Sequence, residues 1–232
     1  MKKKNLFDDS KSKTVDKLKN FSKYVPRQSL ARFLVYYELF KKQLGIKGSI
    51  VECGVHQGGG VMSWAKLSTT LEPYNFHRKI IGFDTFSGFP KISEIDKKYK
   101  YSKKGLFSEK FNTYNELRQT IKEYDKNRYI KHLPKIELVK GDAVKTIPKY
   151  VKDNKHLIIS LLFLDFDIFE PTAVALKYFL PRMPRGSILA FDEINNENWP
   201  GETMALLEKH NINKLKIKNF PSEPHMSFLE IK

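Results

Sequence analysis

Apolar residues follow two different periods that alternate along the chain. Over residues 29–44 they recur every three or four positions, which predicts an amphipathic helix. The run at residues 157–164, LIISLLFL, is apolar at nearly every position, which is typical of a strand buried on both faces of a parallel sheet. Alternation of such segments predicts an α/β protein whose sheet is covered by helices on both faces.

The same patterns predict the remaining elements. Strands are expected at residues 49–52, 79–83, 136–140 and 187–191. Helices are expected between them, at residues 61–71, 114–124, 144–152, 171–180 and 202–210. Two further segments, 214–220 and 225–231, are expected to form an antiparallel hairpin that completes a mixed sheet of about seven strands.

The length of the chain, 232 residues, suits a single domain with a full core. We expect a basic N-terminal tail over residues 1–26 and one domain over residues 27–232. Within that domain, residues 90–112 lack periodicity and are rich in Lys, Ser and Tyr. They are therefore expected to form a loop or lid beside the second strand.

The net charge of the chain is large, at +16. Because the lysines are scattered through every segment, we attribute most of this charge to solvated surface, with an anionic substrate as the main alternative. No stretch reaches the about 18 apolar residues of a membrane-spanning helix, and no apolar signal core follows the basic start. Cys53 is the only cysteine, so an internal disulfide is excluded and a cytoplasmic location is expected.

A glycine-rich turn separates the first two strands. The first strand ends at Glu52, glycines follow at 54 and 58–60, and the second strand leads to Asp84. This half of a nucleotide-binding βαβ unit predicts an adenosine-containing cofactor. His56 stands where a dinucleotide fingerprint needs glycine, and no Gly-Lys-Ser/Thr follows as in a P-loop. S-adenosylmethionine (SAM), which has no pyrophosphate, is therefore favoured.

Acidic residues follow the predicted parallel strands at their carboxyl ends. They are Glu52, Asp84, Asp142, Asp165 and Asp192. Ligands bind along this edge of open α/β sheets, so five acids there predict a binding site rather than five separate helix caps. Asp84 is expected to lie where a ribose would bind, since its carboxylate can accept hydrogen bonds from both hydroxyls.

Several sequence blocks resemble the macrocin O-methyltransferase (TylF/MycF) family. The blocks are ECGVHQGG at 52–59, GFDTFSGFP at 82–90, LDFDIFEPT at 164–172, FDE at 191–193 and WPG at 199–201. The resemblance covers residues 27–205 in order and spacing, and GFDTFSGFP is its most specific block. It implies a Rossmann-like class I SAM-dependent methyltransferase fold, methyl transfer to a sugar hydroxyl, and a bound Mg²⁺.

The resemblance also implies roles for residues at the strand ends. The methionine end of SAM would be lined by Glu52, Gly54, Val55 and Gly58. The ribose would be bound by Asp84 with Thr85 and Phe86 beside it, and the adenine would meet Asp142 and Ala143. Asp165, which also borders SAM, would hold Mg²⁺ together with Asp192 and Glu193.

The chemistry gives these ligands a reason. A sugar hydroxyl is a poor nucleophile at neutral pH, so a metal that lowers its pKa and a carboxylate that accepts its proton would both help. Asp165 is our first choice as both ligand and base, with Asp167 in reserve. The family usually carries Asp-Asp where this chain has Asp192-Glu193, and the longer glutamate can still ligate a metal.

Two other functions stay open on the sequence. One is methyl transfer to a phenol, a lipid or a phosphorylated small molecule; the other is nucleic-acid binding. Nucleic-acid binding needs a basic stripe with interleaved aromatics, and residues 99–104, YKYSKK, are the one local candidate. We therefore expect a small-molecule acceptor, a sugar that could be anionic, and no nucleic-acid partner. A homo-oligomer is left open.

Overall fold

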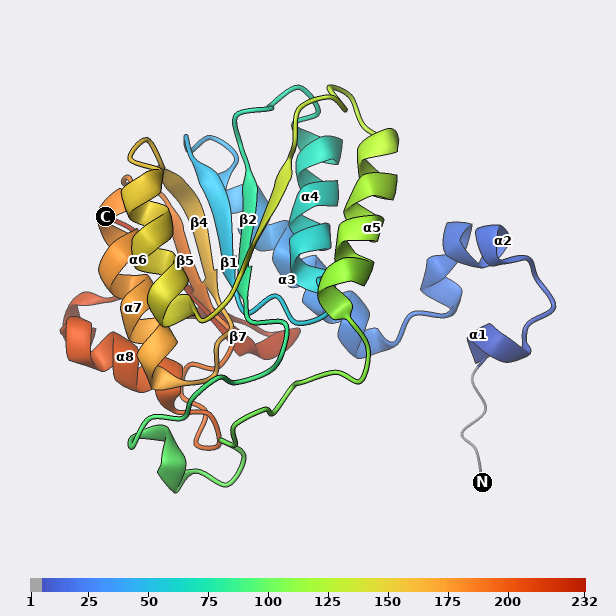
Figure 1. Cartoon of the computed structure of the whole chain (residues 1–232). Helices are drawn as coiled ribbons and strands as arrows, with labels where there is room; N and C mark the ends of the chain where they lie inside the picture. The colour runs from blue at the N-terminus through green and yellow to red at the C-terminus, as the bar shows by residue number, and fades with distance from the viewer. Residues whose placement is uncertain (1–5) are drawn as a thin grey trace.

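A central sheet of seven strands organises residues 6–232, which the computed structural model describes. The strand order is β3-β2-β1-β4-β5-β7-β6 (Figure 1). The strands are Ser49–Cys53 (β1), Ile80–Asp84 (β2), Ile136–Lys140 (β3), Ile159–Leu164 (β4), Ile188–Phe191 (β5), Lys218–Phe220 (β6) and Glu223–Glu230 (β7). The first five are parallel, whereas β7 pairs antiparallel with β5 and β6. The predicted mixed sheet with a C-terminal hairpin is thus confirmed.

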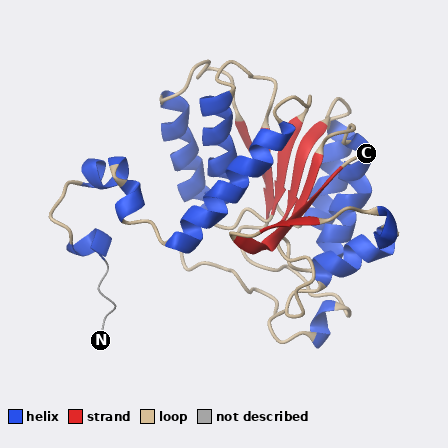
Figure 2. Ribbon diagram, turned by 180° about the vertical axis from the view of Figure 1, so that it is seen from behind, coloured by secondary structure: helices blue, strands red, loops and turns tan. Residues whose placement is uncertain are grey.

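Two layers of helices cover the sheet (Figures 1 and 2). One layer consists of Arg27–Gln43 (α3), Gly59–Leu71 (α4) and Thr113–Lys126 (α5). The other consists of Ala143–Asp153 (α6), Phe169–Phe179 (α7) and Gly201–Lys209 (α8). Each layer packs its own hydrophobic core against one face of the sheet. The architecture is therefore the three-layer sandwich that alternating strands and helices predict.

The burial of the central strand β4 explains why its sequence is apolar at five of six positions. Successive side chains of a strand point to opposite faces of the sheet. Leu162 and Leu164 belong to the core under α6 and α7, whereas Leu161 and Phe163 belong to the core under α3 and α4. All the residues of β4 are buried, and its one polar side chain, Ser160, is satisfied by hydrogen bonds with Gln43 and Arg78.

The first strand of the C-terminal hairpin is shorter than predicted. The sequence predicts a strand from residue 214, but Ile212–Lys214 forms a 3₁₀ turn and β6 begins only at Lys218. The side chain of Asn211 starts this turn by accepting a hydrogen bond from the backbone N–H of Asn213. Leu215 and Ile217 are apolar at alternate positions because both pack on the core, not because they pair in the sheet.

The N-terminal segment stands away from the sheet in both ribbon views (Figures 1 and 2). It contains two short helices, Leu6–Asp9 (α1) and Thr14–Lys19 (α2), followed by a 3₁₀ turn at Phe21–Lys23. Residues 1–5 of the predicted basic tail lie outside the described residues. Among residues 6–232 no helix has the length and apolar character needed to cross a membrane.

The strand order fixes where a ligand would bind. From β1 the chain continues to β2 and β3 on one side of the sheet, and it then returns to β4 and β5 on the other side of β1. A crevice forms at the carboxyl ends of the strands at such a switch point. Of the acids predicted as site residues, Glu52 and Asp84 lie at the ends of β1 and β2, and the others follow β3, β4 and β5, so the fold brings all of them to this one edge.

Candidate active site

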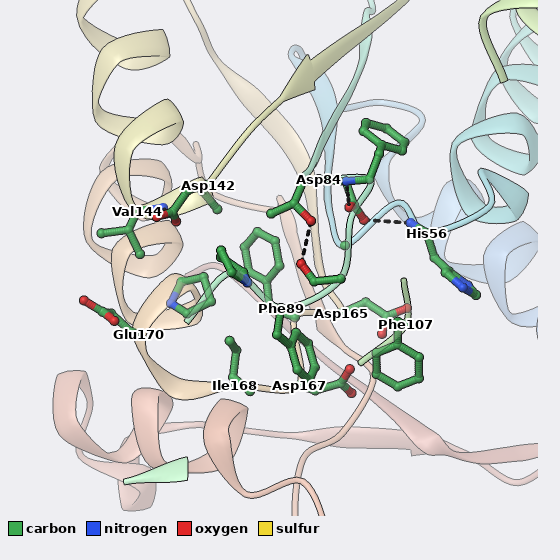
Figure 3. A pocket seen from close by; sticks show the side chains of 18 of the residues that line it. His56, Asp84, Phe89, Phe107, Asp142, Val144, Asp165, Asp167, Ile168 and Glu170 are labelled. Atoms are coloured by element: carbon green, nitrogen blue, oxygen red, sulfur yellow. Dashed lines mark hydrogen bonds between the residues drawn. The ribbon is translucent and has the colours of Figure 1, made fainter. Parts of the chain in front are cut away.

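The carboxyl edge of the sheet surrounds a cavity of about 890 Å³. Most predicted site residues line it together: Gly54, Asp84, Thr85, Phe86, Asp142, Ala143, Asp165, Asp167, Asp192 and Glu193. Figure 3 shows Asp84, Asp142, Asp165 and Asp167 arranged around this space. Glu52 and Val55 line an adjoining hollow of about 760 Å³, which shares Gly54 and Asp165 with the cavity. Gly58 lines neither hollow and instead precedes α4.

Asp84 organises the turn that follows β1. One carboxylate oxygen accepts hydrogen bonds from the backbone N–H groups of Val55 and His56, both at 2.8 Å. The other accepts from the backbone N–H of Phe86 at 2.6 Å. A carboxylate has about four lone-pair sites, so acceptor capacity remains for one ribose hydroxyl. Asp84 thus fixes the cavity wall and can still face a ligand.

Gly54 is required by the close approach of β1 and β4 at their ends. Its φ is +95°, and a Cβ at this position would lie 1.9 Å from the carbonyl oxygen of Asp165. The backbone N–H of Asp165 in turn donates to the carbonyl of Cys53. Any side chain at residue 54 would therefore push Asp165 away from the cavity that both residues line.

Glu52 is a buried acid with spare hydrogen-bonding capacity. It is 2% exposed, and within the described residues its Oε2 has no hydrogen-bond partner. Burial raises the pKa of Glu52 to about 8. A cationic ligand in the adjoining hollow would satisfy this oxygen and favour the ionised form. The ammonium group of SAM has that chemistry, so the site fits the predicted cofactor.

Asp142 and Ala143 begin α6 at the end of β3. The side chain of Asp142 accepts a hydrogen bond from the backbone N–H of Val144 at 3.0 Å and caps the helix. Phe86, which also lines the cavity, packs its ring against Tyr114, with centroids 5.0 Å apart. The predicted adenine and ribose residues therefore flank one part of the cavity.

Arg32 is a site residue that the sequence analysis missed. Its guanidinium donates to Asp165 at 2.9 Å and to Asp192 at 2.8 Å, and to the hydroxyl of Tyr36 at 3.0 Å. Arg32 lines both hollows. It belongs to α3, whose apolar period marked a core helix, and no local pattern relates it to acids more than 130 residues away. This cation joins the ends of β4 and β5.

The acids around Arg32 repel one another. Burial, followed by the charges of Asp192 and Asp167, raises the pKa of Asp165 well above its usual range, although Arg32 opposes the shift. Burial and the charges of Asp192 and Glu193 likewise raise the pKa of Asp167. The pKa of Glu193 is also raised, with burial as the main cause. The site therefore has more negative charge than Arg32 neutralises.

Glu202 is a second residue that the sequence analysis missed. It is fully buried in the first turn of α8, and burial raises its pKa well above the usual value. The preceding Trp199-Pro200-Gly201 block belongs to the sequence resemblance, and Glu202 follows it directly. In the sequence Glu202 resembles an ordinary acid at a helix start, which the helix dipole favours, so nothing marked it as buried.

The loop over residues 90–112 lies across the carboxyl edge and is fastened at several points. Phe89 exchanges backbone hydrogen bonds with Gly105 and Leu106. Glu109 accepts hydrogen bonds from the side chains of His56 and Gln57. These contacts anchor the loop to the turn after β1, beside the cavity.

An aromatic wall closes one side of the cavity. We define it as Phe89, Phe107 and Trp199, all of which line the cavity. The ring of Trp199 lies 6.1 Å from that of Phe89 and 5.9 Å from that of Phe107. Tyr101, which belongs to the loop 90–112, also packs on Trp199, with ring centroids 6.0 Å apart. The wall therefore joins the loop to the segment before α8.

The predicted magnesium ligands suit that ion in kind. Asp165, Asp192 and Glu193 offer hard oxygen donors at neighbouring strand ends. As placed, however, no three His, Cys, Asp or Glu side chains of residues 6–232 are grouped closely enough to hold a metal. The cation that bridges Asp165 and Asp192 in this structure is Arg32.

The family relationship follows from comparison with known proteins. The model of the macrocin-O-methyltransferase (TylF) family matches residues 3–217. The chain belongs to this family. The match is wider than residues 27–205, over which the sequence blocks indicated it, and it includes most of the N-terminal segment. The protein is accordingly a SAM-dependent O-methyltransferase of a family that methylates sugars.

Solved structures support the same assignment. The crystal structure of CalS11, a calicheamicin methyltransferase, has a TM-score of 0.93 and 30% identity over 97% of this chain and 88% of its own. An apo structure of CalS11, described as a TDP-rhamnose 3'-O-methyltransferase, has a TM-score of 0.84 and 28% identity over 97% and 90%. The O-methyltransferase NovP shares the fold, with a TM-score of 0.67 and 18% identity over 87% and 80%. No curated protein matches the chain.

Proposed function

We propose that this enzyme transfers the methyl group of SAM to a hydroxyl of a sugar carried by a nucleoside diphosphate. The observation that carries the proposal is that two kinds of surface line one cavity. Asp165 and Asp167 line it, and so does the aromatic wall of Phe89, Phe107 and Trp199. A sugar presents hydroxyls at its rim and C–H groups on its faces. Carboxylates and aromatic rings suit these two surfaces, respectively.

The nucleotide part of the proposed acceptor rests on two observations. Lys91 and Lys145 line the same cavity as the acids and can interact with phosphate groups. CalS11, which is similar over nearly the whole chain, is described as acting on TDP-rhamnose. A phosphorylated acceptor also gives the excess of lysine in this protein a function beyond solubility.

Asp167 is the base that we favour over Asp165. The carboxylate of Asp165 is bound by Arg32, whereas within residues 6–232 the carboxylate of Asp167 has no hydrogen-bond or ion-pair partner. Both lie against the cavity. A free carboxylate with a raised pKa can take the proton of an attacking hydroxyl, and Asp165 then serves to orient the acceptor.

Mg²⁺ is part of the proposal because the acids at the ends of β4 and β5 outnumber the cations near them. Asp165, Asp192 and Glu193 would hold the ion once Arg32 moves aside, and their oxygens suit it. A bound ion would lower the pKa of an acceptor hydroxyl. The protein's own residues would meanwhile orient the sugar, exclude water through the loop 90–112, and accept the proton at Asp167.

A methyl-transfer assay tests this function. Purified enzyme is incubated with methyl-labelled SAM and separate sets of nucleoside diphosphate sugars, neutral glycosides, phenols and lipids, with Mg²⁺ or with excess EDTA. We expect transfer to nucleoside diphosphate sugars in Mg²⁺ and its loss in EDTA. Preference for neutral glycosides would contradict the nucleotide part, and full activity in EDTA would contradict the metal part.

A further inference from the structure

Glu202 joins two segments that carry the acids of the site. Its Oε2 accepts a hydrogen bond from the backbone N–H of Glu193 at 3.0 Å, and its Oε1 accepts from the backbone N–H of Asp167 at 3.3 Å. These N–H groups belong to the segments that follow β5 and β4. One buried side chain therefore bonds to the backbone of both segments.

The sheet itself does not hold these segments together. The last ladder pair of β4 and β5 is Leu164 with Phe191, and the N–H of Asp192 makes the final backbone bond, to the carbonyl of Leu164. Within residues 6–232, Glu202 is the one side chain that hydrogen-bonds to the backbone of both segments beyond that point. Arg32 links the side chains of Asp165 and Asp192, whereas the separation of the backbone at Asp167 and Glu193 depends on Glu202.

The backbone conformation at Asp167 is one that a hydrogen bond to Glu202 would stabilise. Its φ is +61°, in the left-handed region, which aspartate tolerates better than most residues but less readily than glycine. Strained residues of this kind persist only where their surroundings determine them. Glu202 holds the N–H of Asp167, and two residues later Asp96 holds the N–H of Phe169 with both carboxylate oxygens.

Gly201 lets α8 approach closely enough for this contact. A Cβ at Gly201 would lie 2.5 Å from the carbonyl oxygen of Asp167 and from the backbone N of Phe169. The first turn of α8 therefore packs directly on the backbone of residues 167–169. This places Glu202, the residue after Gly201, between the segments that follow β4 and β5. The WPG block that precedes it thus has a structural purpose at the site.

We propose that Glu202 is a positioning residue, which sets the separation of Asp167 and Glu193 and thereby aligns the acceptor hydroxyl for methyl transfer. The proposal rests on the proposed function of Asp167 and Glu193. Glu202 itself does not line the cavity, so it acts through the backbone of these two residues. A displacement of about 1 Å at reacting groups can cost about 100-fold in rate, so small changes at Glu202 are expected to matter.

The substitution Glu202→Gln tests the inference. Glutamine has the same shape, but its NH₂ group faces one of the two backbone N–H donors and cannot accept from it. We expect kcat to fall about 100-fold, while the Kd of SAM changes by less than about twofold, because Glu202 is not among the cofactor residues. Amide exchange is measured in parallel. The N–H groups of Asp167 and Glu193 are expected to be protected in the wild type and to exchange faster in the variant.

Thr203→Val is the matched control. The hydroxyl of Thr203 accepts a hydrogen bond from the N–H of Asn195 at 2.8 Å. Like the bond from Glu193 to Glu202, it joins α8 to the segment after β5, and this variant removes it. It leaves the N–H groups of Asp167 and Glu193 bonded, and we expect its kcat to remain within about twofold of the wild type. If Glu202→Gln does not fold, Glu202→Asp replaces it, since its shorter side chain cannot reach both donors.

Three results would overturn the inference. They are an unchanged kcat in a folded Glu202 variant, an equal loss of kcat in Thr203→Val, and rapid exchange of both amides in the wild type. A wild-type enzyme that methylates no acceptor would instead contradict the proposed function. Amide exchange would still show whether Glu202 holds the two segments, so the two failures can be told apart.

Discussion

The guanidinium of Arg32 lies 2.9 Å from the carboxylate of Asp165, and its other terminal nitrogen lies 2.8 Å from that of Asp192. These two acids are also proposed ligands of Mg²⁺. One cation therefore stands where another is proposed to bind. Because the guanidinium and the metal ion need the same oxygens, metal binding has to displace Arg32 from at least one of them.

Arg32→Met is expected to tighten Mg²⁺ binding and to destabilise the metal-free protein. Removal of the competing cation should lower the Kd of Mg²⁺ about tenfold, which corresponds to about 1.4 kcal/mol. The unpaired acids should cost about 1–3 kcal/mol of unfolding free energy, since the pair is only partly buried. Calorimetric titration of Mg²⁺ and urea unfolding measure the two effects. Lys41→Met on the same helix, which breaks an exposed pair with Glu38, is the control and should change neither.

Arg32 also illustrates what the sequence could not supply. The apolar period of residues 29–44 predicts the helix and its buried face, because that pattern is local. The partners of Arg32 are 133 and 160 residues away, and only the folded sheet brings them together. The acids themselves could be predicted, since each follows a strand and parallel strands end at one edge. The cation that pairs with them, Arg32, could not be predicted.

Asp84→Ala and Asp167→Asn are expected to separate cofactor binding from catalysis. Asp84→Ala leaves three backbone N–H groups without an acceptor and removes the proposed ribose ligand, so SAM affinity should fall about 100-fold or more. Asp167→Asn keeps the shape of the side chain and removes the proposed base, so kcat should fall about 10²–10⁴-fold with SAM affinity unchanged. Calorimetry of SAM binding and initial rates measure the two properties. Equal loss of SAM affinity in both variants would contradict the division of roles.

Glu202 shows a different limit of sequence reasoning. The sequence predicts the helix 202–210 within one residue of its start, and the WPG block before it resembles the family. Neither observation distinguishes an exposed acid at a helix start from a buried one. That distinction depends on Gly201, whose missing side chain lets α8 rest on residues 167–169. The packing is a property of the tertiary structure.

Glu52 is expected to make the stability of the SAM-free protein depend on pH. Its pKa rises from 4.5 to about 8 on folding, because the side chain is buried. Below pH 4.5 the group is neutral in both states, so its contribution to folding is fully present there. As the pH rises toward 8, the unfolded chain ionises first and this contribution is lost, at about 1.4 kcal/mol for each pH unit between the two pKa values.

Glu52→Gln should remove this pH dependence. Urea unfolding at pH 5, 6.5 and 8 should show a variant that gains stability relative to the wild type as the pH rises. Glu208→Gln, at an exposed position of α8, is the control and should give a constant difference. A constant difference for Glu52→Gln as well would show that the buried carboxylate does not titrate as described.

Trp199→Ala is expected to weaken acceptor binding without affecting SAM. Trp199 contacts Phe89, Phe107 and Tyr101, so its removal opens the aromatic wall and loosens the loop 90–112. The KM of the acceptor should rise about tenfold, equivalent to about 1.4 kcal/mol of lost binding, while the Kd of SAM stays the same. Trp199 lies at the cavity, so its fluorescence in the wild type should also change when acceptor binds.

Phe111→Ala is the control for this prediction. Phe111 belongs to the same loop and is 51% exposed, but it lines a small hollow beside α4 and α5 and not the cavity. A rise in the acceptor KM in both variants would indicate that the loop as a whole, rather than the aromatic wall, determines acceptor binding. An unchanged KM in Trp199→Ala would remove the wall from the acceptor site. The acids would then remain as the only proposed contacts to the sugar.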